Sequence, residues 1–367
     1  MRTRTFSSRM PWDAPPNAIT AALARVRADG REILDLSESN PTRAGIEYDH
    51  AAILEALGDP RSLTYEPSAR GLGEAREAIA AYERVSPDRI LLTASTSEAY
   101  ALLFKLFCNP GDEVLSPRPS YPLFEFLAGL EGVTMKQFPM RYHEGWWIDL
   151  DMLDAMIGER TRAIVTVSPN NPTGSYLKRN EWERLARTGL PVIVDEVFRD
   201  YAFGPDPERI VRPEGAFVLS GFSKLLGLPQ MKLAWIVVPD EEAGGRLELI
   251  ADTYLSVSAP VQWATPKWLL LQEHFHRVMM DRLRGNFAEL RRRTEPLRIE
   301  GGWYAVLRLP RTETEESWAL TLLEEDGVLV QPGYFYDFEN EAWAIVSLLT
   351  RPDIFKEGLD RICRRAF

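Results

Sequence analysis

Apolar positions in the chain follow two alternating patterns between about residue 70 and residue 240. Apolar residues with helical spacing predict helices over 73–84, 97–107, 121–131, 149–157 and 178–188. Short apolar runs rich in β-branched residues predict strands over 89–93, 112–116, 133–139, 162–168, 191–197, 215–220 and 233–239. Strands that alternate with helices in this way imply crossover connections, and therefore an α/β fold with a mostly parallel seven-stranded sheet covered on both faces.

The pattern changes after residue 240. The elements predicted there are a long helix from about 260 to 293, strands over 301–310, 327–331 and 341–349, and helices over 316–326 and at the end of the chain. We expect these elements to form a smaller α+β domain, joined by the amino-terminal segment that contains "REILDLSESNP". The expected division assigns residues 45–255 to a large domain, and residues 1–44 with 256–367 to the small domain.

Length and composition are those of an ordinary folded protein. The 367 residues exceed what one core usually serves, and 45% of them are apolar and 26% charged. The formal net charge of −11 argues against nucleic acid or an anionic membrane as a partner of the whole molecule. No apolar run reaches the roughly 18 residues that a membrane span needs, and the start "MRTRTFSSRMPWDAPP" lacks the apolar segment of a secretory signal. We therefore expect a cytoplasmic protein.

Metal ligands are scarce in the sequence. The two cysteines, Cys108 and Cys363, are too few for a disulfide framework or a zinc site. His274 and His276 lie two positions apart in a helical segment, so their side chains point to different faces. We expect no metal site.

Polar residues follow directly after several predicted strands, which is where parallel sheets bind their ligands. Ser95 to Glu98, after the strand 89–93, has the spacing of a capping box, and a helix start of this kind also offers backbone N–H groups to a phosphate. Taken alone, this pattern is better explained by a plain helix cap.

The next two strand ends carry amides and acids. By itself "PNNPTG", after the strand 162–168, is an ordinary tight turn, although it brings carboxamides to a strand end. Asp195 follows an apolar run in the strand 191–197, which suggests burial, and a buried carboxylate needs a partner. A nearby arginine such as Arg199 explains Asp195 as well as a functional role does.

Lys224 follows the strand 215–220 in the stretch "SGFSKLLGLPQMKLAW". Burial among apolar residues disfavours the charged form of lysine, and lysines that lose their proton easily form Schiff bases. Lys232 stands eight residues later at the start of an apolar run. Each of these signals is weak alone, but their succession at the ends of strands indicates a functional site.

These segments together resemble a known family. The stretches "YEPSARGLGEAR", "TASTSEA", "PSYP", "SPNNPTG", "VIVDEVF" and "SGFSKLLGLPQMKLAW" are similar, in order and spacing, to the class I/II aminotransferases, which are pyridoxal-phosphate enzymes of fold type I. The resemblance extends over about residues 30 to 365. It implies pyridoxal 5'-phosphate as the cofactor and the fold of those enzymes.

The resemblance also implies roles for individual residues. Lys224 is implied to be the Schiff-base lysine, and Asp195 the partner of the cofactor's pyridinium nitrogen, so that the ring can take up electrons. Asn171 is implied to bond the ring's phenolic oxygen, and Tyr121 to stack on the ring face. The residues implied to bind the phosphate are Ser95, Thr96, Ser223 and Lys232, with Tyr65 reaching it from a neighbouring subunit.

The chain departs from the family pattern at several positions. Lys232 stands where the family usually has an arginine on the phosphate, so the charge is kept and the planar, bidentate contact is lost. Phe198 stands in place of a tyrosine, and Gly221 in place of a serine or threonine. Ile345 occupies the position of the arginine that binds the substrate's α-carboxylate in the family.

Two interpretations of Ile345 are open. Either the substrate lacks an α-carboxylate, or another cation such as Arg351 or Arg43 holds it, although arginines are mostly exposed. The aromatic residues of "GYFYDF", Tyr334, Phe335 and Tyr336, could line a substrate pocket, but packing in the core is the more common role.

The function implied by the resemblance is that of a homodimeric aminotransferase, which moves an amino group from an amino donor to a keto acceptor through Lys224. A lyase with the same cofactor, acting by β- or γ-elimination or by decarboxylation, is an alternative, because the reaction depends on which Cα bond stands perpendicular to the ring. A non-catalytic, cofactor-binding regulator is a third hypothesis. The acidic charge disfavours it, and so does the segment before residue 30, which is too short for a helix-turn-helix unit.

Overall fold

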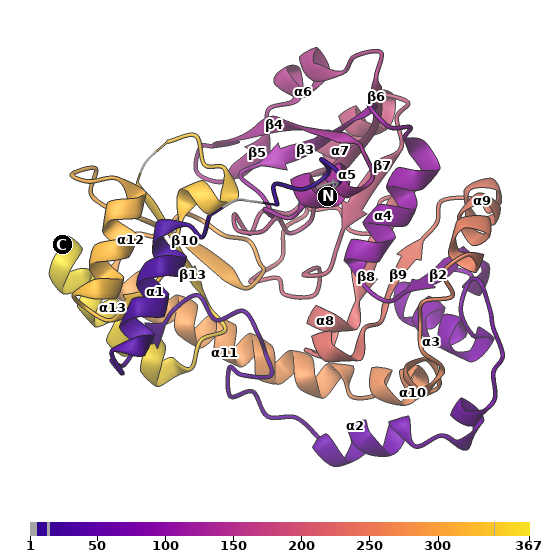
Figure 1. The fold of residues 1–367 in the computed structure, drawn as a ribbon, viewed down its shortest axis with the longest axis horizontal. Helices are drawn as coiled ribbons and strands as arrows, with labels where there is room; N and C mark the ends of the chain where they lie inside the picture. The colour runs from indigo at the N-terminus through magenta and orange to yellow at the C-terminus, as the bar shows by residue number, and fades with distance from the viewer. Residues whose placement is uncertain (1–5, 13–14, 341) are drawn as a thin grey trace, which may run out of the picture.

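The structure, a computed structural model, describes residues 6–12, 15–340 and 342–367. In this part of the chain a central sheet of eight strands has the order β2-β9-β8-β7-β6-β3-β4-β5 (Figure 1). The strands are β2 Ile90–Thr93, β3 Glu113–Arg118, β4 Thr134–Tyr142, β5 Trp146–Ile148, β6 Thr161–Val167, β7 Val192–Asp195, β8 Phe217–Gly221 and β9 Ala234–Val237. The five strands from β8 to β4 are parallel, whereas β9 runs antiparallel to both neighbours. The predicted α/β fold with a mostly parallel sheet is confirmed.

The sheet has one strand more than the seven predicted. β5 pairs antiparallel with the end of β4, so that Met140 lies opposite Ile148. A tight turn joins the two strands, in which Glu144 has a φ of 52° and the His143 N–H bonds to the Gly145 carbonyl. A strand of 3 residues is too short to show a periodic pattern, so its pairing with β4 is a tertiary effect.

Helices cover both faces of the sheet. They are α3 Gly73–Glu83, α4 Thr96–Phe107, α5 Phe124–Leu130, α6 Leu150–Met156, α7 Arg179–Arg187, α9 Glu241–Asp252 and α10 Ala259–Leu269. Helices α4, α5 and α9 pack side chains such as Leu103 and Phe124 on one face, and the others pack Ile79, Leu185 and Trp268 on the opposite face. Burial on both faces explains why the parallel strands are apolar runs. In the described ranges no helix combines the length and the apolar character needed to cross a membrane.

An amino-terminal helix and the carboxyl-terminal part of the chain pack together beside the sheet, at the left of Figure 1. Helix α1 Ala18–Ala28 packs on α12 Glu315–Glu324, and β1 Leu34–Asp35 pairs with β11 Val328–Leu329. The described residues of this part form an antiparallel sheet in the order β10 Tyr304–Arg308, β13 Trp343–Ser347 and β12 Gln331–Pro332, followed by α13 Pro352–Ala366. The domain boundaries assigned from the sequence stay predictions.

The segment 260–293, predicted as one long helix, contains two. Helix α10 ends at Leu269, and α11 Gln272–Arg293 begins after a short corner. Leu270 at this corner is 83% exposed, while Trp268 is buried beneath the large sheet and Phe275 is buried in the core of the other part. The two helices bury their apolar faces in different cores, and this change of direction is not visible in the helical spacing of the sequence.

Candidate active site

The carboxyl ends of the parallel strands open into a cavity of about 290 Å³. The loops that follow β2, β6 and β7, with the short helix α8 Phe222–Leu225 after β8, supply much of its wall. All of the predicted cofactor residues except Tyr65 line this cavity, namely Ser95, Thr96, Tyr121, Asn171, Asp195, Ser223, Lys224 and Lys232. The fold therefore brings together side chains that are far apart in the sequence.

The Nζ atom of Lys224 is enclosed by aromatic rings. It lies 4.7 Å from the centroid of the Trp303 ring and 5.3 Å from that of the Phe198 ring. Burial lowers the pKa of Lys224 to about 8, although the charge of Asp195 acts in the opposite direction. The Tyr201 hydroxyl donates a hydrogen bond of 2.6 Å to the Lys224 carbonyl and so fixes the short helix α8. The amine can therefore reach its uncharged, nucleophilic form close to neutral pH.

The Asp195 carboxylate is buried at the carboxyl end of β7. It accepts hydrogen bonds from the Tyr100 hydroxyl at 2.9 Å and from the Val197 N–H at 3.1 Å. Burial raises the pKa of Asp195 to about 6, whereas the two hydrogen bonds and the charge of Lys224 lower it. A cation bound beside this carboxylate would favour its ionised form. Sequence reasoning missed Tyr100, because a tyrosine in an apolar helix is indistinguishable from a core residue.

Arg199 is not the partner of Asp195. The Arg199 guanidinium binds Glu83 at 2.9 Å and Glu196 at 2.8 Å, and these three side chains are almost completely buried. The same Glu83 carboxylate accepts a hydrogen bond of 2.9 Å from the Trp235 indole. Because Arg199 belongs to this separate network, Asp195 is left to face the cavity.

The amino terminus of α4 also lies at the cavity. The Ser95 hydroxyl accepts a hydrogen bond from the Glu98 N–H at 3.2 Å, and the Glu98 carboxylate accepts one from the Ala94 N–H at 2.6 Å. The capping pattern is therefore present, with its return bond one residue earlier than in a capping box. The groups at this end of the cavity are the hydroxyls of Ser95, Thr96 and Ser223, the helix N–H groups and the exposed Lys232. Such a set suits an anion.

The two asparagines of "PNNPTG" have different surroundings. Asn170 is used within the fold, since its amide donates to the Pro119 carbonyl and to Thr173 and accepts from Ser120. Asn171 lines the cavity, and its Oδ1 atom is buried without a hydrogen-bond partner among the described residues. Buried polar atoms are rarely unpaired, so this amide has free capacity to bind a ligand.

The arginines considered for a substrate carboxylate lie elsewhere. Ile345 is fully buried in β13. Arg351 is exposed and binds Asp353 at 2.7 Å, and Arg43 is exposed as well. Neither arginine is among the residues that line the cavity. Tyr336 of the "GYFYDF" stretch is buried in the hydrophobic core, in agreement with the packing role expected for it.

The glycine at position 221 has a steric cause. A Cβ atom there would lie 2.8 Å from the Ala234 Cβ and 3.1 Å from the Leu233 carbonyl oxygen, because β8 and β9 are adjacent. A serine or threonine therefore does not fit unless β9 moves. Phe198, the other departure next to Lys224, is buried with its ring edge-on to Trp303 at 5.3 Å.

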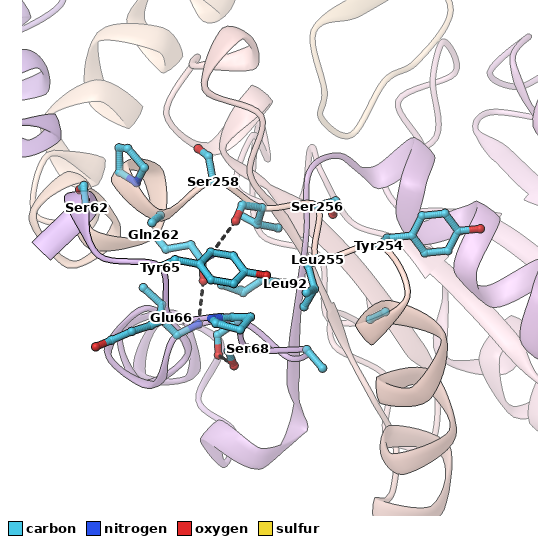
Figure 2. A pocket seen from close by; sticks show the side chains of 18 of the residues that line it. Ser62, Tyr65, Glu66, Ser68, Leu92, Tyr254, Leu255, Ser256, Ser258 and Gln262 are labelled. Atoms are coloured by element: carbon cyan, nitrogen blue, oxygen red, sulfur yellow. Dashed lines mark hydrogen bonds between the residues drawn. The ribbon is translucent and has the colours of Figure 1, made fainter.

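Tyr65 lies away from the cavity that contains Lys224. It is 81% exposed and lines a separate pocket of about 400 Å³. Gln262 and Leu255 line the same pocket (Figure 2). The Gln262 amide shapes this pocket by accepting a hydrogen bond from the Leu72 N–H at 2.6 Å and donating one of 2.8 Å to the Val257 carbonyl. Tyr65 is thus accessible to a second molecule.

Comparison with known proteins agrees with this arrangement. Residues 31–362 match the family described as aminotransferase class I and II. Nicotianamine aminotransferase 1 from Oryza sativa subsp. japonica is 26% identical over 381 residues, which cover 91% of this chain and 76% of that protein. An S-alkyl-thiohydroximate lyase from Arabidopsis thaliana is 30% identical over 231 residues, which cover 58% of this chain and 50% of that protein. The structure of an alanine aminotransferase from Pyrococcus furiosus has the same fold, with a TM-score of 0.86, 23% identity, and coverage of 98% of this chain and 99% of that one.

Proposed function

The chain belongs to the class I and II aminotransferases, pyridoxal-phosphate enzymes that move an amino group from an amino donor to a keto acceptor, and we propose that Lys224 is the lysine through which it binds the cofactor. The predicted family, cofactor and enzyme class are confirmed by the match over residues 31–362. The roles of individual residues are our proposal. One observation carries it: Lys224, Asp195, Asn171 and the start of α4 all line one cavity.

The residues of the cavity fit the cofactor. The Asn171 amide lines the cavity, so its NH2 group would donate to the ring's phenolic oxygen, while its buried oxygen, which lacks a partner among the described residues, can accept from a ligand donor. Asp195 is a buried carboxylate that lacks a cation in direct contact within the described chain, and a protonated ring nitrogen would be such a cation. Ser95, Thr96, Ser223 and Lys232 are the groups that would hold the phosphate, and Tyr121 would contact the ring face.

When bound, pyridoxal phosphate supplies an aldehyde that takes up the amino group and a ring that accepts electrons released at the donor carbon. Lys224 would hold the cofactor until the donor amine displaces it. Its Nζ atom, which loses its proton more easily than an ordinary lysine, would then take the proton from the donor carbon in its uncharged form, and would deliver one to the acceptor carbon in the reverse half of the cycle. Tyr201 positions this lysine through the Lys224 carbonyl, and Tyr100 holds the Asp195 carboxylate in place.

A second copy of the chain would complete the site by bringing its Tyr65 to the phosphate. Apart from Tyr65, this side of the molecule exposes large apolar side chains, with Leu54, Leu63 and Leu270 at 65%, 91% and 83% exposure. They come from α2 His50–Leu57, the short helix η1 Pro60–Leu63 and the end of α10, and α10 packs on both of the other helices. Exposed apolar clusters of this kind favour association, and a symmetric dimer is the commonest form of it.

The proposal is tested by loading the protein with pyridoxal phosphate and recording its visible absorption. We expect the wild type to show the band of a lysine-bound cofactor, and Lys224→Ala to lose the band and at least a thousandfold in turnover, because the attachment and the proton carrier are both removed. Lys356→Ala, which removes an exposed lysine on α13, is the matched control and should behave as wild type. Full turnover by Lys224→Ala would reject the proposal.

The lyase alternative is favoured by one observation, the 30% identity to an S-alkyl-thiohydroximate lyase over 58% of this chain. The same loaded enzyme separates the two reactions. A lyase releases its product, with ammonia when elimination yields a keto acid, and needs no keto acceptor. A transaminase converts one equivalent of donor and then stops until an acceptor is added.

A further inference from the structure

The cavity around Lys224 also has to hold the amino donor, and its charges limit what that donor can be. Among the described residues of its lining, the cationic side chains are Lys224 and Lys232. The proposed function, on which this inference rests, uses Lys224 for the aldehyde of the cofactor and Lys232 for its phosphate. Within the described lining, no cation is then left for a carboxylate on the donor.

Arginines close to these strand ends in the sequence are engaged elsewhere. Arg118, at the end of β3, binds Glu339 at 2.7 Å. Arg199, after β7, is held by Glu83 and Glu196. A guanidinium from either residue could enter the cavity only by leaving a carboxylate behind, and in the buried Arg199 network that carboxylate would have lost its charge partner.

The rest of the lining consists of hydroxyl and apolar groups. Ser39 and Tyr304 contribute hydroxyls, and Phe124, Val197 and Phe198 contribute apolar surface. Tyr304 is 8% exposed, and burial raises the pKa of its hydroxyl to about 12, although its hydrogen bond with Ser39 acts in the opposite direction. An anion placed beside Tyr304 would therefore meet a surrounding of low polarity without an available cation in the described lining.

We infer that the amino donor carries no carboxylate on the carbon that bears its amino group, and that it is a primary amine with an apolar or hydroxyl-bearing substituent. A carboxylate brought into this lining would lose its water without gaining an ion pair, which is the costly case for a buried charge. The hydroxyls of Ser39 and Tyr304 can bond a neutral substituent, and Phe124 and Phe198 can pack against it.

The acceptor follows from the same argument, because both substrates of a transaminase use one site in turn. The donor carbon loses a proton and an electron pair together with its amino nitrogen, and water supplies the oxygen that makes it an aldehyde or ketone. The acceptor, an aldehyde or ketone without a neighbouring carboxylate, gains that nitrogen, the proton and the electron pair at its carbonyl carbon and releases its oxygen as water. The two half-reactions balance with no other oxidant or reductant.

Matched pairs of donors test the inference directly. Each pair consists of an α-amino acid and the amine that remains when its carboxylate is removed: L-tyrosine and tyramine, L-leucine and 3-methylbutylamine, L-lysine and cadaverine. The measurement is the rate at which the visible band of the loaded enzyme disappears at equal, subsaturating donor concentration. We expect at least one amine to react roughly 100-fold or more faster than its amino acid, and no amino acid to react faster than its amine.

The opposite preference would overturn the inference and leave the proposed function intact. If an amino acid reacts as fast as its amine or faster, a cation outside the described lining, such as one from a second copy, holds the carboxylate. If the wild type forms no visible band, or if Lys224→Ala keeps it, the proposed function fails and the inference fails with it. The two failures are therefore distinguishable from one set of spectra.

Binding measurements decide the remaining case, in which the band forms and no donor removes it. Calorimetric titration with the unreactive pair tyrosol and 3-(4-hydroxyphenyl)lactate compares the same ring without and with a carboxylate. We expect tyrosol to bind the loaded enzyme at least about tenfold more tightly. Tighter binding of the lactate would overturn the inference without reference to turnover.

Discussion

The two central residues of the site, Lys224 and Asp195, are shifted toward their uncharged forms by the same cause. Burial lowers the pKa of Lys224 to about 8 and raises that of Asp195 to about 6. Keeping both groups out of water destabilises the fold. In the proposed roles, a bound cofactor would offset this cost by offering an aldehyde to Lys224 and a cation to Asp195. Both predictions at the residue scale follow from these shifts.

The rate of cofactor uptake should depend on pH through Lys224. A lysine with a lowered pKa reaches its uncharged form at a lower pH than an ordinary lysine, and the uncharged amine is the nucleophile. We expect the uptake rate of the cofactor-free protein, followed by its visible absorption, to rise about tenfold per pH unit below about 8 and then to level off. A rate that keeps rising toward pH 10 would contradict the shift.

Asp195→Asn should separate stability from function. A carboxyl whose pKa is raised by folding contributes stability at low pH, and this contribution is lost as the pH rises through about 6. At pH 7.5 the ionised group therefore weakens the cofactor-free fold, while asparagine keeps an oxygen for the bonds from Tyr100 and Val197. We expect a melting temperature equal to or above that of the wild type at pH 7.5, with the difference disappearing below about pH 4, the usual pKa of an aspartate in an unfolded chain, and a loss of turnover of at least 100-fold. A variant that is less stable at every pH would contradict this account.

At the element scale, a buried ion pair and a hydrogen bond connect α3, β7 and β9 next to the site. Glu83, the last residue of α3, binds Arg199 after β7 and accepts from the Trp235 indole of β9. This buried network fixes the loop that carries Phe198, whose ring faces Lys224. The network thus links the packing of a helix to the surroundings of Lys224.

Glu83→Gln should destabilise the protein strongly, because it removes the charge that faces the buried Arg199 guanidinium. Breaking one partner of a buried ion pair costs about 3–5 kcal/mol, so we expect the melting temperature to fall by at least several degrees. Glu242→Gln is the matched control, since its bond to Arg246 lies on the surface with the two side chains 77% and 66% exposed. Exposed pairs contribute little, so this variant should melt as the wild type does. Equal melting of both variants would show that the network is dispensable.

At the scale of the whole molecule, the proposed dimer makes cofactor binding depend on a second copy. Tyr65→Phe should weaken pyridoxal-phosphate binding roughly tenfold, because a hydrogen bond to a charged group is lost, while the mass by sedimentation stays that of a dimer. Tyr254→Phe is the matched control, because Tyr254 lines the same pocket and is 52% exposed (Figure 2). Unchanged cofactor affinity in Tyr65→Phe, or a monomeric wild type, would contradict the proposal.

Much of the large sheet could be predicted from the sequence, because its elements leave local signals. The helix predicted over 73–84 is α3 Gly73–Glu83, and the strand predicted over 89–93 is β2 Ile90–Thr93. The residues that line the cavity also follow strands in the sequence, and parallel strands bring their carboxyl ends to one edge. The apolar spacing of an element, and the residues that directly follow a strand, are properties of short segments. A single sequence therefore shows them.

The tertiary structure decided the contacts that have no local signal. The sequence by itself determined the alternation of helices and strands, the succession of site residues from Ser95 to Lys232, and the family resemblance that they support. Only the folded chain placed Trp303 against Lys224 and Tyr100 on Asp195, assigned Arg199 to Glu83, and divided the segment 260–293 between two cores. The physical reason is the same in each case. The partner of a side chain across the fold depends on how distant segments pack, and this packing cannot be predicted from the spacing of residues along the chain.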